Sequence, residues 1–309
     1  MTVLVTGATG FLGRHVVQQL LETNHEVRVM VRSPGSESVL QTPPTDVCYG
    51  NVTDPDALAE ACRGISEVIH LVAVIRGGSR RFEAINRQGT ANVVAAAREA
   101  GSVRRFVHLS AVGAANVPHL RYLHSKWLGE QEVVNGGLPY TIIRPSLIFG
   151  PGDEFTNAIA ALVRSLPITP VIGSGNNRLQ PIHVEDVARC VALSLSGNIR
   201  GNRTVEIGGP EQLSYNEIIR VVARVMSRRR LLVNVPLWKM RLPIAMMEML
   251  TPRAPINRAM LQLITLRNVA EPDSVERVFG FRPRTFAGNI DHVRTMTFGQ
   301  ALRANLGLS

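Results

Sequence analysis

A tyrosine and a lysine stand four positions apart in Tyr122-Leu-His-Ser-Lys126, a spacing that puts both side chains on one face of a helix. Only two of the 34 basic residues are lysines, Lys126 and Lys239. An ammonium is a compact charge that lowers the pKa of a nearby phenol, and such a phenol can pass a proton to or from a substrate oxygen. We therefore predict that Tyr122 and Lys126 are catalytic. The alternative is a helical tyrosine beside a snorkelling lysine.

A glycine-rich turn, Thr6-Gly-Ala-Thr-Gly-Phe-Leu-Gly13, follows an apolar strand-like run and opens a helical pattern. Gly7 permits the tight turn, Gly10 lets the backbone approach a pyrophosphate, and Gly13 lets helix and strand pack closely. The first amides of the helix would face the anion. No Gly-Lys-Ser/Thr follows, which excludes a P-loop. The turn predicts a dinucleotide site with contacts from Gly7, Thr9, Gly10, Phe11, Leu12 and Gly13.

The residues after the second predicted strand bear on the choice of dinucleotide. An acid there would bind the ribose 2′-hydroxyl of NAD, whereas an arginine accepts the 2′-phosphate of NADP. The chain has Arg32 and Ser33 and no acid at this point. We predict NADP, with Arg14 as a second contact, and NAD as the alternative; a solvated surface Arg32 is the other interpretation. After the third strand, adenine contacts are predicted from Asn51 and Val52.

These side chains must be positioned by a repeating pattern of strands and helices. Val/Ile-rich strand runs alternate with helical runs, which indicates a parallel sheet with helices on both faces. The predicted strands are 2–6, 26–31, 67–73, 105–110 and 140–144, and the helices are 11–21, 56–63, 80–100 and 122–134. The second half is less regular and includes a capping box, Ser214 with Glu217, at the start of a helix over 214–226.

The predicted fold class is therefore α/β: a doubly wound parallel Rossmann sheet with a smaller, mostly helical C-terminal cap domain. Residues 1–150 form the dinucleotide-binding domain, and 177–208 return to it. Residues 151–176 and 209–309 form the substrate or cap domain. The length of 309 residues fits this arrangement.

Composition limits the class of protein. Apolar residues make up 45% and charged residues 19%, as in globular chains, and no apolar run approaches the ~18 residues of a membrane span. The chain passes from Met1 into a strand-like run, so we expect no secretory leader. Three scattered cysteines indicate reduced thiols in the cytoplasm. The eight histidines form no ligand cluster, so no metal site is expected.

The net charge of +10 is unevenly placed. Residues 1–150 hold 14 basic and 12 acidic residues, whereas residues 220–267 hold ten basic residues and one acid. This stretch also contains Trp238 and several Met and Leu residues, as interfacial segments do. It could contact an anionic membrane at its inner face, a membrane-complex partner, or a lipophilic pocket that a cap helix covers. No aromatic stacking platform accompanies the charge, so nucleic acid is not expected.

Several motifs together resemble the extended or atypical short-chain dehydrogenases/reductases. They are the opening turn, the Tyr-x-x-x-Lys pair and Arg144-Pro-Ser-Leu-Ile-Phe-Gly-Pro-Gly-Asp153. Further segments are similar to the group that contains the Rossmann-type accessory subunit of respiratory complex I and its free-standing bacterial relatives, which are NAD-dependent epimerase/dehydratase-like. Those segments are 68–73, 82–92, 106–110, 149–155, 180–188 and 279–283. The likeness runs from residue 2 to about residue 286.

The resemblance implies roles for further residues. Asn86 would hold a water near the active lysine, and Ser110 would be the catalytic serine. Ala111 follows where many relatives have a second serine, and if Ala111 is the aligned position one oxyanion donor is missing. The cofactor ribose would be lined by Leu71, Val72 and Ala73, and the nicotinamide would be walled by Pro145, Ser146, Leu147 and Ile148.

Two functions follow from the resemblance. The first is an NAD(P)-dependent oxidoreductase that moves a hydride between nicotinamide and a carbonyl or conjugated double bond of a small, apolar substrate, with Tyr122 as the acid. The second is a catalytically weak or inactive NADP(H)-binding structural or assembly protein of a membrane respiratory complex. A sugar-nucleotide epimerase is disfavoured, because the stretch from Ser110 to Tyr122 is short.

Overall fold

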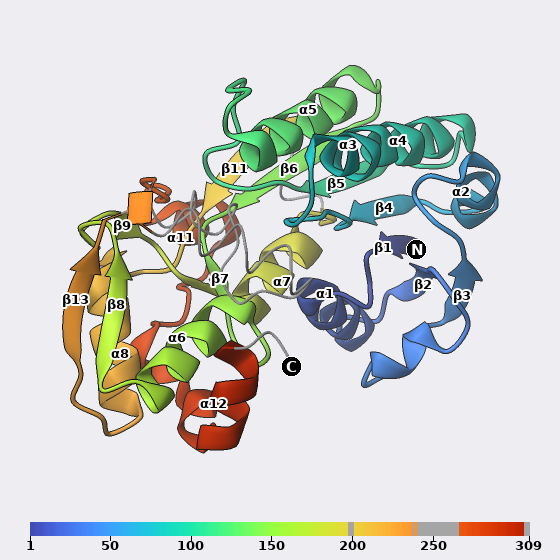
Figure 1. Cartoon of the computed structure of the whole chain (residues 1–309). Coiled ribbons are helices and arrows are strands. Elements are labelled where there is room, and N and C mark those ends of the chain that lie inside the picture. Colours follow the sequence, from blue (N-terminus) through green and yellow to red (C-terminus); the bar gives the residue numbers. More distant parts are fainter. Residues whose placement is uncertain (197–200, 237, 240–265, 306–309) are drawn as a thin grey trace. The chain divides into compact units, whose positions relative to one another are not determined.

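The computed structural model describes residues 1–196, 201–236, 238–239 and 266–305, and it divides into two compact units (Figure 1). The first unit consists of Met1–Pro145, Val184–Ile207 and Ser274–Phe281, and the second of Ser146–His183, Gly208–Asp273 and Arg282–Ser309. The segment 274–281, which the sequence places in the cap, falls in the first unit because its helix packs against other elements of that unit.

One parallel sheet of seven strands organises the first unit. The strands are β1 (Thr2–Thr6), β2 (Glu26–Val31), β3 (Asp46–Tyr49), β4 (Glu67–His70), β5 (Arg105–Leu109), β6 (Tyr140–Pro145) and β11 (Arg203–Ile207). Their order in the sheet is β11-β6-β5-β4-β1-β2-β3, and each neighbouring pair is parallel. Val3, Leu4 and Val5 are wholly buried, as expected of a strand with helices on both sides. The predicted parallel α/β fold is confirmed.

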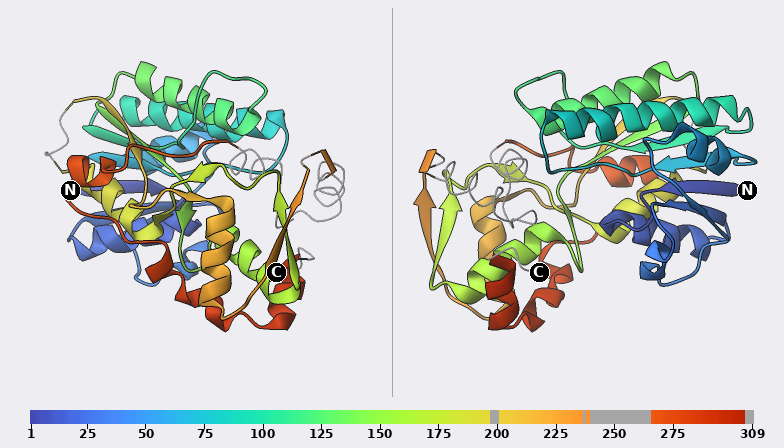
Figure 2. Two further views of the ribbon diagram at one scale, coloured as in Figure 1. Left: turned by 90° about the vertical axis from the view of Figure 1, so that its left-hand side faces the viewer. Right: turned by 45° about the vertical axis from the view of Figure 1, so that its right-hand side comes forward.

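Helices cover both faces of this sheet (Figures 1 and 2). On one face, α1 (Phe11–Glu22) packs against α7 (Val184–Leu193), which contacts α11 (Ser274–Phe279). The other face carries α2 (Pro55–Cys62), α3 (Ser79–Phe82), α4 (Gly89–Glu99) and α5 (Arg121–Asn135). The long helix predicted over 80–100 is interrupted, because a π-helical turn, η2 (Glu83–Gln88), joins α3 to α4.

The second unit combines helices with short strand pairs. Its helices are α6 (Glu154–Ser165), α8 (Tyr215–Val225) and α12 (Phe298–Asn305). Its strand pairs are β7 (Ile148–Phe149) with β10 (Ile182–His183), β8 (Ile168–Ile172) with β13 (Leu231–Val235), and β9 (Arg178–Leu179) with β12 (Leu213–Ser214). The predicted capping box begins α8, with Ser214 and Glu217 bonded reciprocally. The core between α6 and α8 includes Phe149, Ile159 and Ile218.

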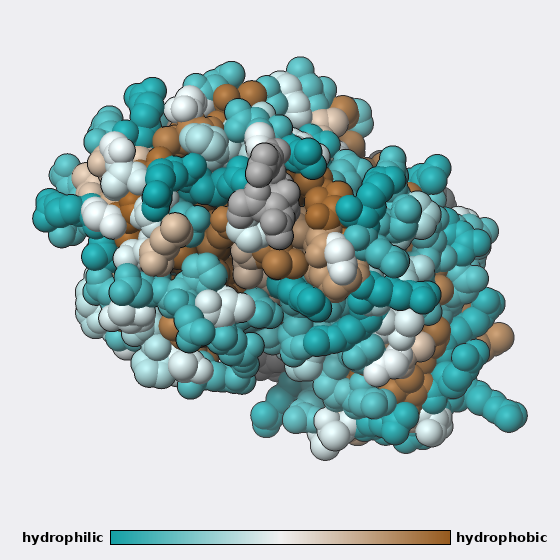
Figure 3. All heavy atoms as spheres, turned by 180° about the vertical axis from the view of Figure 1, so that it is seen from behind, coloured by the Kyte–Doolittle hydropathy of each residue, from teal (hydrophilic) through white to brown (hydrophobic). Residues whose placement is uncertain are grey.

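The remaining elements are the short 3-10 turns η1 (Ser36–Val39), η3 (Ala287–Asn289) and η4 (Asp291–Thr295). No helix among the described residues has the length and hydropathy that a membrane span requires. The face drawn in Figure 3 carries hydrophilic residues over most of its area, with smaller hydrophobic patches between them. The part of the basic stretch that covers 240–265 lies outside the described residues.

Candidate functional site

The predicted site residues of the first unit gather at one edge of its sheet. Because neighbouring strands are parallel, their carboxyl ends meet at the same edge. Gly7, Arg32, Asn51, Leu71 and Ser110 come directly or closely after β1, β2, β3, β4 and β5. The chain winds outward in opposite directions from β1 and β4, and ligands of open α/β sheets bind at such a switch point.

The turn between β1 and α1 has the geometry that its glycines predict. Gly7 has φ of 80°, which favours glycine, and its carbonyl accepts a hydrogen bond from the Gly10 amide at 3.1 Å. A Cβ on Gly13 would lie 2.1 Å from the Gly7 oxygen, so only glycine allows the helix to pack this closely. Gly10 caps α1 without any side-chain bond. The first amides of the helix are thus free of a side-chain cap, as an anion site requires.

This turn contacts the end of β4. A Cβ on Gly7 would lie 3.1 Å from the carbonyl carbon of Leu71 and from the Val72 nitrogen. The Leu71 amide donates to the Thr6 oxygen at 3.0 Å. Leu71, Val72 and Ala73 are all partly exposed. Two segments predicted to bind the cofactor, which are far apart in sequence, are therefore adjacent.

The predicted adenosine contacts lie where β2 and β3 end. The Gly50 amide donates to the Val31 oxygen at 2.9 Å, which joins the two strand ends. Arg32, Ser33 and Asn51 are exposed, whereas Val52 is buried and belongs to the hydrophobic core. Only the backbone of Val52 therefore remains for a ligand contact.

Tyr122 and Lys126 both lie on the buried side of α5. Tyr122 is 8% exposed and Lys126 is 3% exposed. Burial raises the pKa of Tyr122 to about 12 and lowers the pKa of Lys126 to about 8, while the charge of Glu130 acts in the opposite direction. The Lys126 Nζ donates to the Leu109 carbonyl at 2.6 Å, which leaves further donors of the ammonium for a ligand.

Ser110 lies just beyond β5 and is buried. Its amide donates to the Ile143 oxygen at 2.7 Å, but among the described residues its hydroxyl has no hydrogen-bond partner. A buried hydroxyl without a partner is costly and calls for an explanation. Contact with a substrate oxygen is one such explanation. Ala111 follows and is also buried, so it supplies no second hydroxyl.

Asn86 lies in the π-helical turn and is 1% exposed. Its Oδ1 accepts from the Val74 amide at 2.8 Å, and its Nδ2 donates to the Val74 oxygen at 3.0 Å and to the Ser125 Oγ at 2.9 Å. The Ser125 hydroxyl donates to the Tyr122 carbonyl at 2.7 Å. Asn86 therefore ties the loop after β4 to the helix that carries Tyr122; its predicted contact with a water stays a prediction.

Two histidines beneath the site are packed and neutral. His70 bonds Thr6 Oγ1 at 2.7 Å and Thr90 Oγ1 at 3.1 Å. Its ring stacks on His108, with centroids 5.4 Å apart. Burial lowers the pKa of His70 to about 3 and that of His108 well below its usual value, and the charge of Lys126 adds to both shifts. No group of three or more metal-ligating side chains occurs in the described part of the chain.

Sequence reasoning missed the ion pair that fixes α5. Arg144 on β6 binds both oxygens of Glu130 on α5, at 2.8 and 2.6 Å, and Glu206 on β11 at 3.3 Å. The Glu130 side chain is 3% exposed. Glu130 is four residues after Lys126, so the shared helix face was a signal. The partner strand could not be inferred from spacing.

The predicted nicotinamide wall is divided between the units. Pro145 ends the first segment of the first unit, Met1–Pro145, and its carbonyl accepts from the Val112 amide at 2.9 Å. In the second unit, Ser146 donates to the Asn268 carbonyl at 2.8 Å, Leu147 packs against the core, and Ile148 pairs with Ile182 in β7–β10. Their joint contact with a ligand stays a prediction.

The chain is similar to several characterised proteins. It is 32% identical over 235 residues, 76% of this chain and 73% of the relative, to the ceramide reductase of Caulobacter vibrioides. It is 29% identical over 242 residues to the Arabidopsis thaliana protein named NADH dehydrogenase [ubiquinone] 1 alpha subcomplex subunit 9, mitochondrial. The matched stretch is 75% of this chain and 60% of the Arabidopsis protein.

A solved structure shares the fold. The dTDP-glucose 4,6-dehydratase DesIV of Streptomyces venezuelae, solved with NAD bound, superposes with a TM-score of 0.72 at 24% identity over 95% of this chain and 96% of that chain. The model of the "NAD dependent epimerase/dehydratase family" matches residues 3–208. With this match over most of the sheet unit, the chain belongs to the NAD dependent epimerase/dehydratase family.

Proposed function

We propose that this protein is an NAD(P)-dependent oxidoreductase of the short-chain dehydrogenase/reductase type. One observation carries the proposal: Tyr122 and Lys126 are both buried on one side of α5, and the buried hydroxyl of Ser110 lies beyond a neighbouring strand without a hydrogen-bond partner among the described residues. Buried titratable side chains with strongly shifted pKa values, as Tyr122 and Lys126 have, are typical of catalytic sites.

The cofactor is proposed to be NADP, with NAD as the alternative. The uncapped start of α1 fits a pyrophosphate, and the exposed Arg32 fits a 2′-phosphate better than a 2′-hydroxyl. When bound, the nicotinamide supplies hydride chemistry. The solved structure of the same fold with NAD bound supports a dinucleotide as the ligand.

The side chains then have distinct roles. The Tyr122 hydroxyl donates the proton to the substrate oxygen or receives it. The Lys126 ammonium, held by the Leu109 carbonyl, donates its remaining hydrogen bonds to the ribose hydroxyls of the cofactor. The Ser110 hydroxyl donates a hydrogen bond to the substrate oxygen and stabilises charge that develops there. Asn86 positions α5 through Ser125.

The proposed substrate is a small, apolar carbonyl or conjugated compound. The name of the Caulobacter relative, ceramide reductase, supports an apolar substrate. Measuring NADPH oxidation with a panel of aliphatic and aromatic ketones, aldehydes and enones tests the proposal. We expect Tyr122→Phe to lower kcat by roughly 100-fold or more, and the control Tyr49→Phe, whose ring is 47% exposed, to retain full turnover. Full turnover by Tyr122→Phe would contradict the proposed mechanism.

A second candidate function is a structural or assembly role in a membrane respiratory complex, with NADP(H) bound but not turned over. The similarity to the Arabidopsis NADH dehydrogenase subunit favours it, as does Ala111 beside Ser110. This function predicts that NADPH raises the melting temperature of the wild type and of Tyr122→Phe equally, and that the protein co-purifies with a membrane complex. Rapid turnover by a protein without partners would count against it.

The location and partners form part of the same proposal. We propose a cytoplasmic protein that associates peripherally with the inner face of the membrane, either with anionic lipid or with a membrane-complex partner, through residues 220–267. The uneven charge supports this, because ten of the basic residues lie in that stretch. No role in nucleic-acid binding is proposed.

A further inference from the structure

The two-stranded ribbon β8–β13 of the second unit has an apolar outer face. Leu231 pairs with Ile168 and Val233 pairs with Pro170, so these four residues share one face. Ile168 is 49% exposed, Leu231 65% and Val233 43%. The opposite face carries the buried Thr169 and Val171 and the half-buried Leu232, while Asn234 on that face is exposed. A sheet face in water normally carries polar residues, so this face calls for something to cover it.

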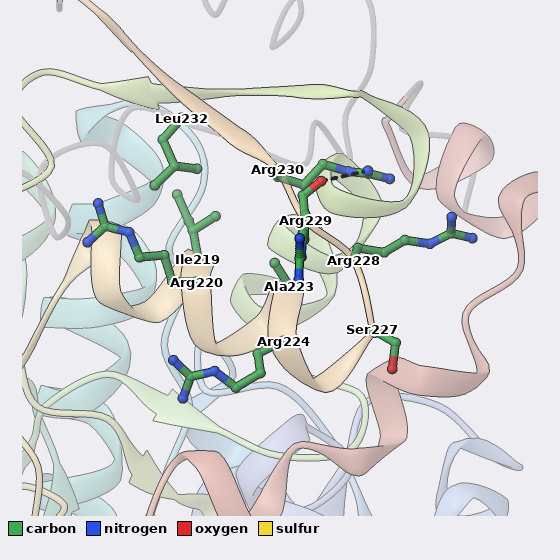
Figure 4. A pocket seen from close by; sticks show the side chains of 9 residues that line it. All are labelled: Ile219, Arg220, Ala223, Arg224, Ser227, Arg228, Arg229, Arg230 and Leu232. Atoms are coloured by element: carbon green, nitrogen blue, oxygen red, sulfur yellow. Dashed lines mark hydrogen bonds between the residues drawn. The ribbon is translucent and has the colours of Figure 1, made fainter.

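Arginines line a cavity of about 540 Å³ between α8 and the edge of this ribbon, where Leu232 of the inner face contributes to the lining (Figure 4). They come from the end of α8 and the segment that leads into β13, and they are Arg220, Arg224, Arg228, Arg229 and Arg230. Figure 4 shows Arg220 and Arg224 extending toward the left and Arg228 toward the right. Because the guanidinium groups spread apart, they suit many anionic groups on a surface better than one small anion.

Most of these arginine side chains form no hydrogen bond with the described residues. The Arg228 amide donates to the Ala223 carbonyl at 2.8 Å and the Ser227 amide to the Arg224 carbonyl at 3.0 Å. This is a Schellman motif, which satisfies the end of α8 through the backbone. Arg230 is the exception, because its Nε donates to the Val163 carbonyl at 2.7 Å.

Among the described residues, the charge of Arg220 helps to lower the pKa of Glu217, which is itself paired with Arg178. No carboxylate there forms an ion pair with Arg220, Arg224, Arg228 or Arg229. Grouped like charges repel one another, and an external anionic partner would offset that repulsion. Charge complementarity therefore points to a partner that is densely negative.

An aromatic residue lies beyond the other end of β13. Trp238 is 69% exposed, and the Nζ of Lys239 lies 5.3 Å from the centre of its ring. Exposed tryptophan beside basic residues is enriched at the boundary between lipid headgroups and acyl chains. We use the name α8–β13 surface for three neighbouring features. They are the outer face of β8–β13, Trp238, and the four arginines without ion pairs, Arg220, Arg224, Arg228 and Arg229.

We propose that the α8–β13 surface docks on an anionic phospholipid membrane, with its apolar face at the headgroup boundary and its arginines on lipid phosphates. This inference rests on the peripheral association in the proposed function and assigns it to one surface and one partner. A second copy of the chain fits poorly, because both copies would bring the same net positive charge to the contact. Nucleic acid does not account for the exposed aliphatic side chains.

Vesicle sedimentation of the full chain tests the docking. We expect the protein to pellet at low salt with vesicles of equal parts phosphatidylcholine and phosphatidylglycerol, but not with phosphatidylcholine alone. The triple variant Arg224→Gln, Arg228→Gln, Arg229→Gln should bind the anionic vesicles roughly 100-fold more weakly. The double variant Leu231→Gln, Val233→Gln should also bind more weakly, and its remaining binding should fall more steeply with salt.

A control variant with the same net charge separates this surface from overall charge. The control changes three exposed arginines elsewhere in the chain, Arg98→Gln, Arg203→Gln and Arg282→Gln. It should bind anionic vesicles as the wild type does. The docking would be overturned if both triple variants lost vesicle binding equally. It would also be overturned if the protein pelleted equally with neutral vesicles, or did not pellet with anionic vesicles at low salt. If NADPH still raises the melting temperature of every variant, such a failure refutes the docking and leaves the proposed oxidoreductase intact.

Discussion

Replacing Lys126 with methionine should stabilise the cofactor-free protein while it removes turnover. Burial lowers the pKa of Lys126 from 10.5 to about 8, which corresponds to about 3 kcal/mol of unfavourable burial of the charge near pH 7. Methionine has a similar shape and no charge, but it gives up the hydrogen bond to the Leu109 carbonyl, which contributes about 1 kcal/mol. The expected net gain is about 2 kcal/mol.

The sign of the pH dependence provides a second readout. The folded-state pKa of Lys126 is depressed, so the unfolded chain holds the proton to a higher pH. The wild type should therefore gain stability as the pH rises from about 8 to about 10.5, and Lys126→Met should lack this gain. Urea unfolding of both proteins over this range measures the difference, with Lys239→Met as the exposed control. A variant that is less stable near pH 7, or a difference independent of pH, would refute the reasoning.

Three further predictions concern residues that build the site. Gly13→Ala should destabilise the protein by about 2 kcal/mol, because its Cβ would lie 2.1 Å from a carbonyl oxygen of the turn; thermal melting measures this, and an unchanged melting temperature would contradict the packing. Glu130→Gln should lower the free energy of unfolding by about 3 kcal/mol, because it leaves Arg144 without its buried partner. The control Glu60→Gln, at an exposed pair, should lower it by less than about 0.5 kcal/mol. Equal losses of stability in urea unfolding would refute this prediction. Arg32→Ala should weaken binding of NADPH by about tenfold more than binding of NADH, and equal effects in fluorescence titrations would argue against a 2′-phosphate contact.

Local signals in the sequence predicted the sheet and its phosphate-binding turn. In strand runs such as Thr2–Thr6 the three central residues are apolar, because they are buried on both faces of the sheet. The spacing of Gly7, Gly10 and Gly13 reflects a backbone geometry with few alternatives. The spacing of Tyr122 and Lys126 likewise fixed their common helix face.

Features that depend on tertiary neighbours were not predictable in this way. The π-helical turn around Asn86 interrupts a run of helix-forming residues, and within it Asn86 pairs with Val74 and Ser125, which are distant in sequence. The pair of Arg144 and Glu130 requires that β6 pass beside α5. No spacing along the chain encodes either contact.

The outer face of β8–β13 shows the same limit. Leu231-Leu-Val-Asn-Val235 lacks a clear alternation of apolar and polar residues. The exposed side of β13 became evident only through its register with β8 and through the burial of Thr169 and Val171. The clustering of arginines was visible in the sequence. That exposed aliphatic side chains lie near these arginines was not.

The central claim is that the carboxyl edge of the parallel sheet binds a dinucleotide beside Tyr122 and Lys126. Titrating the purified protein with NADPH, and following nicotinamide fluorescence, tests it most directly. We predict saturable binding by the wild type and binding weakened by roughly tenfold in Lys126→Met, since the ammonium donates to the ribose hydroxyls. Absence of binding of both NADPH and NADH to the wild type, or equal affinity in the variant, would contradict the account.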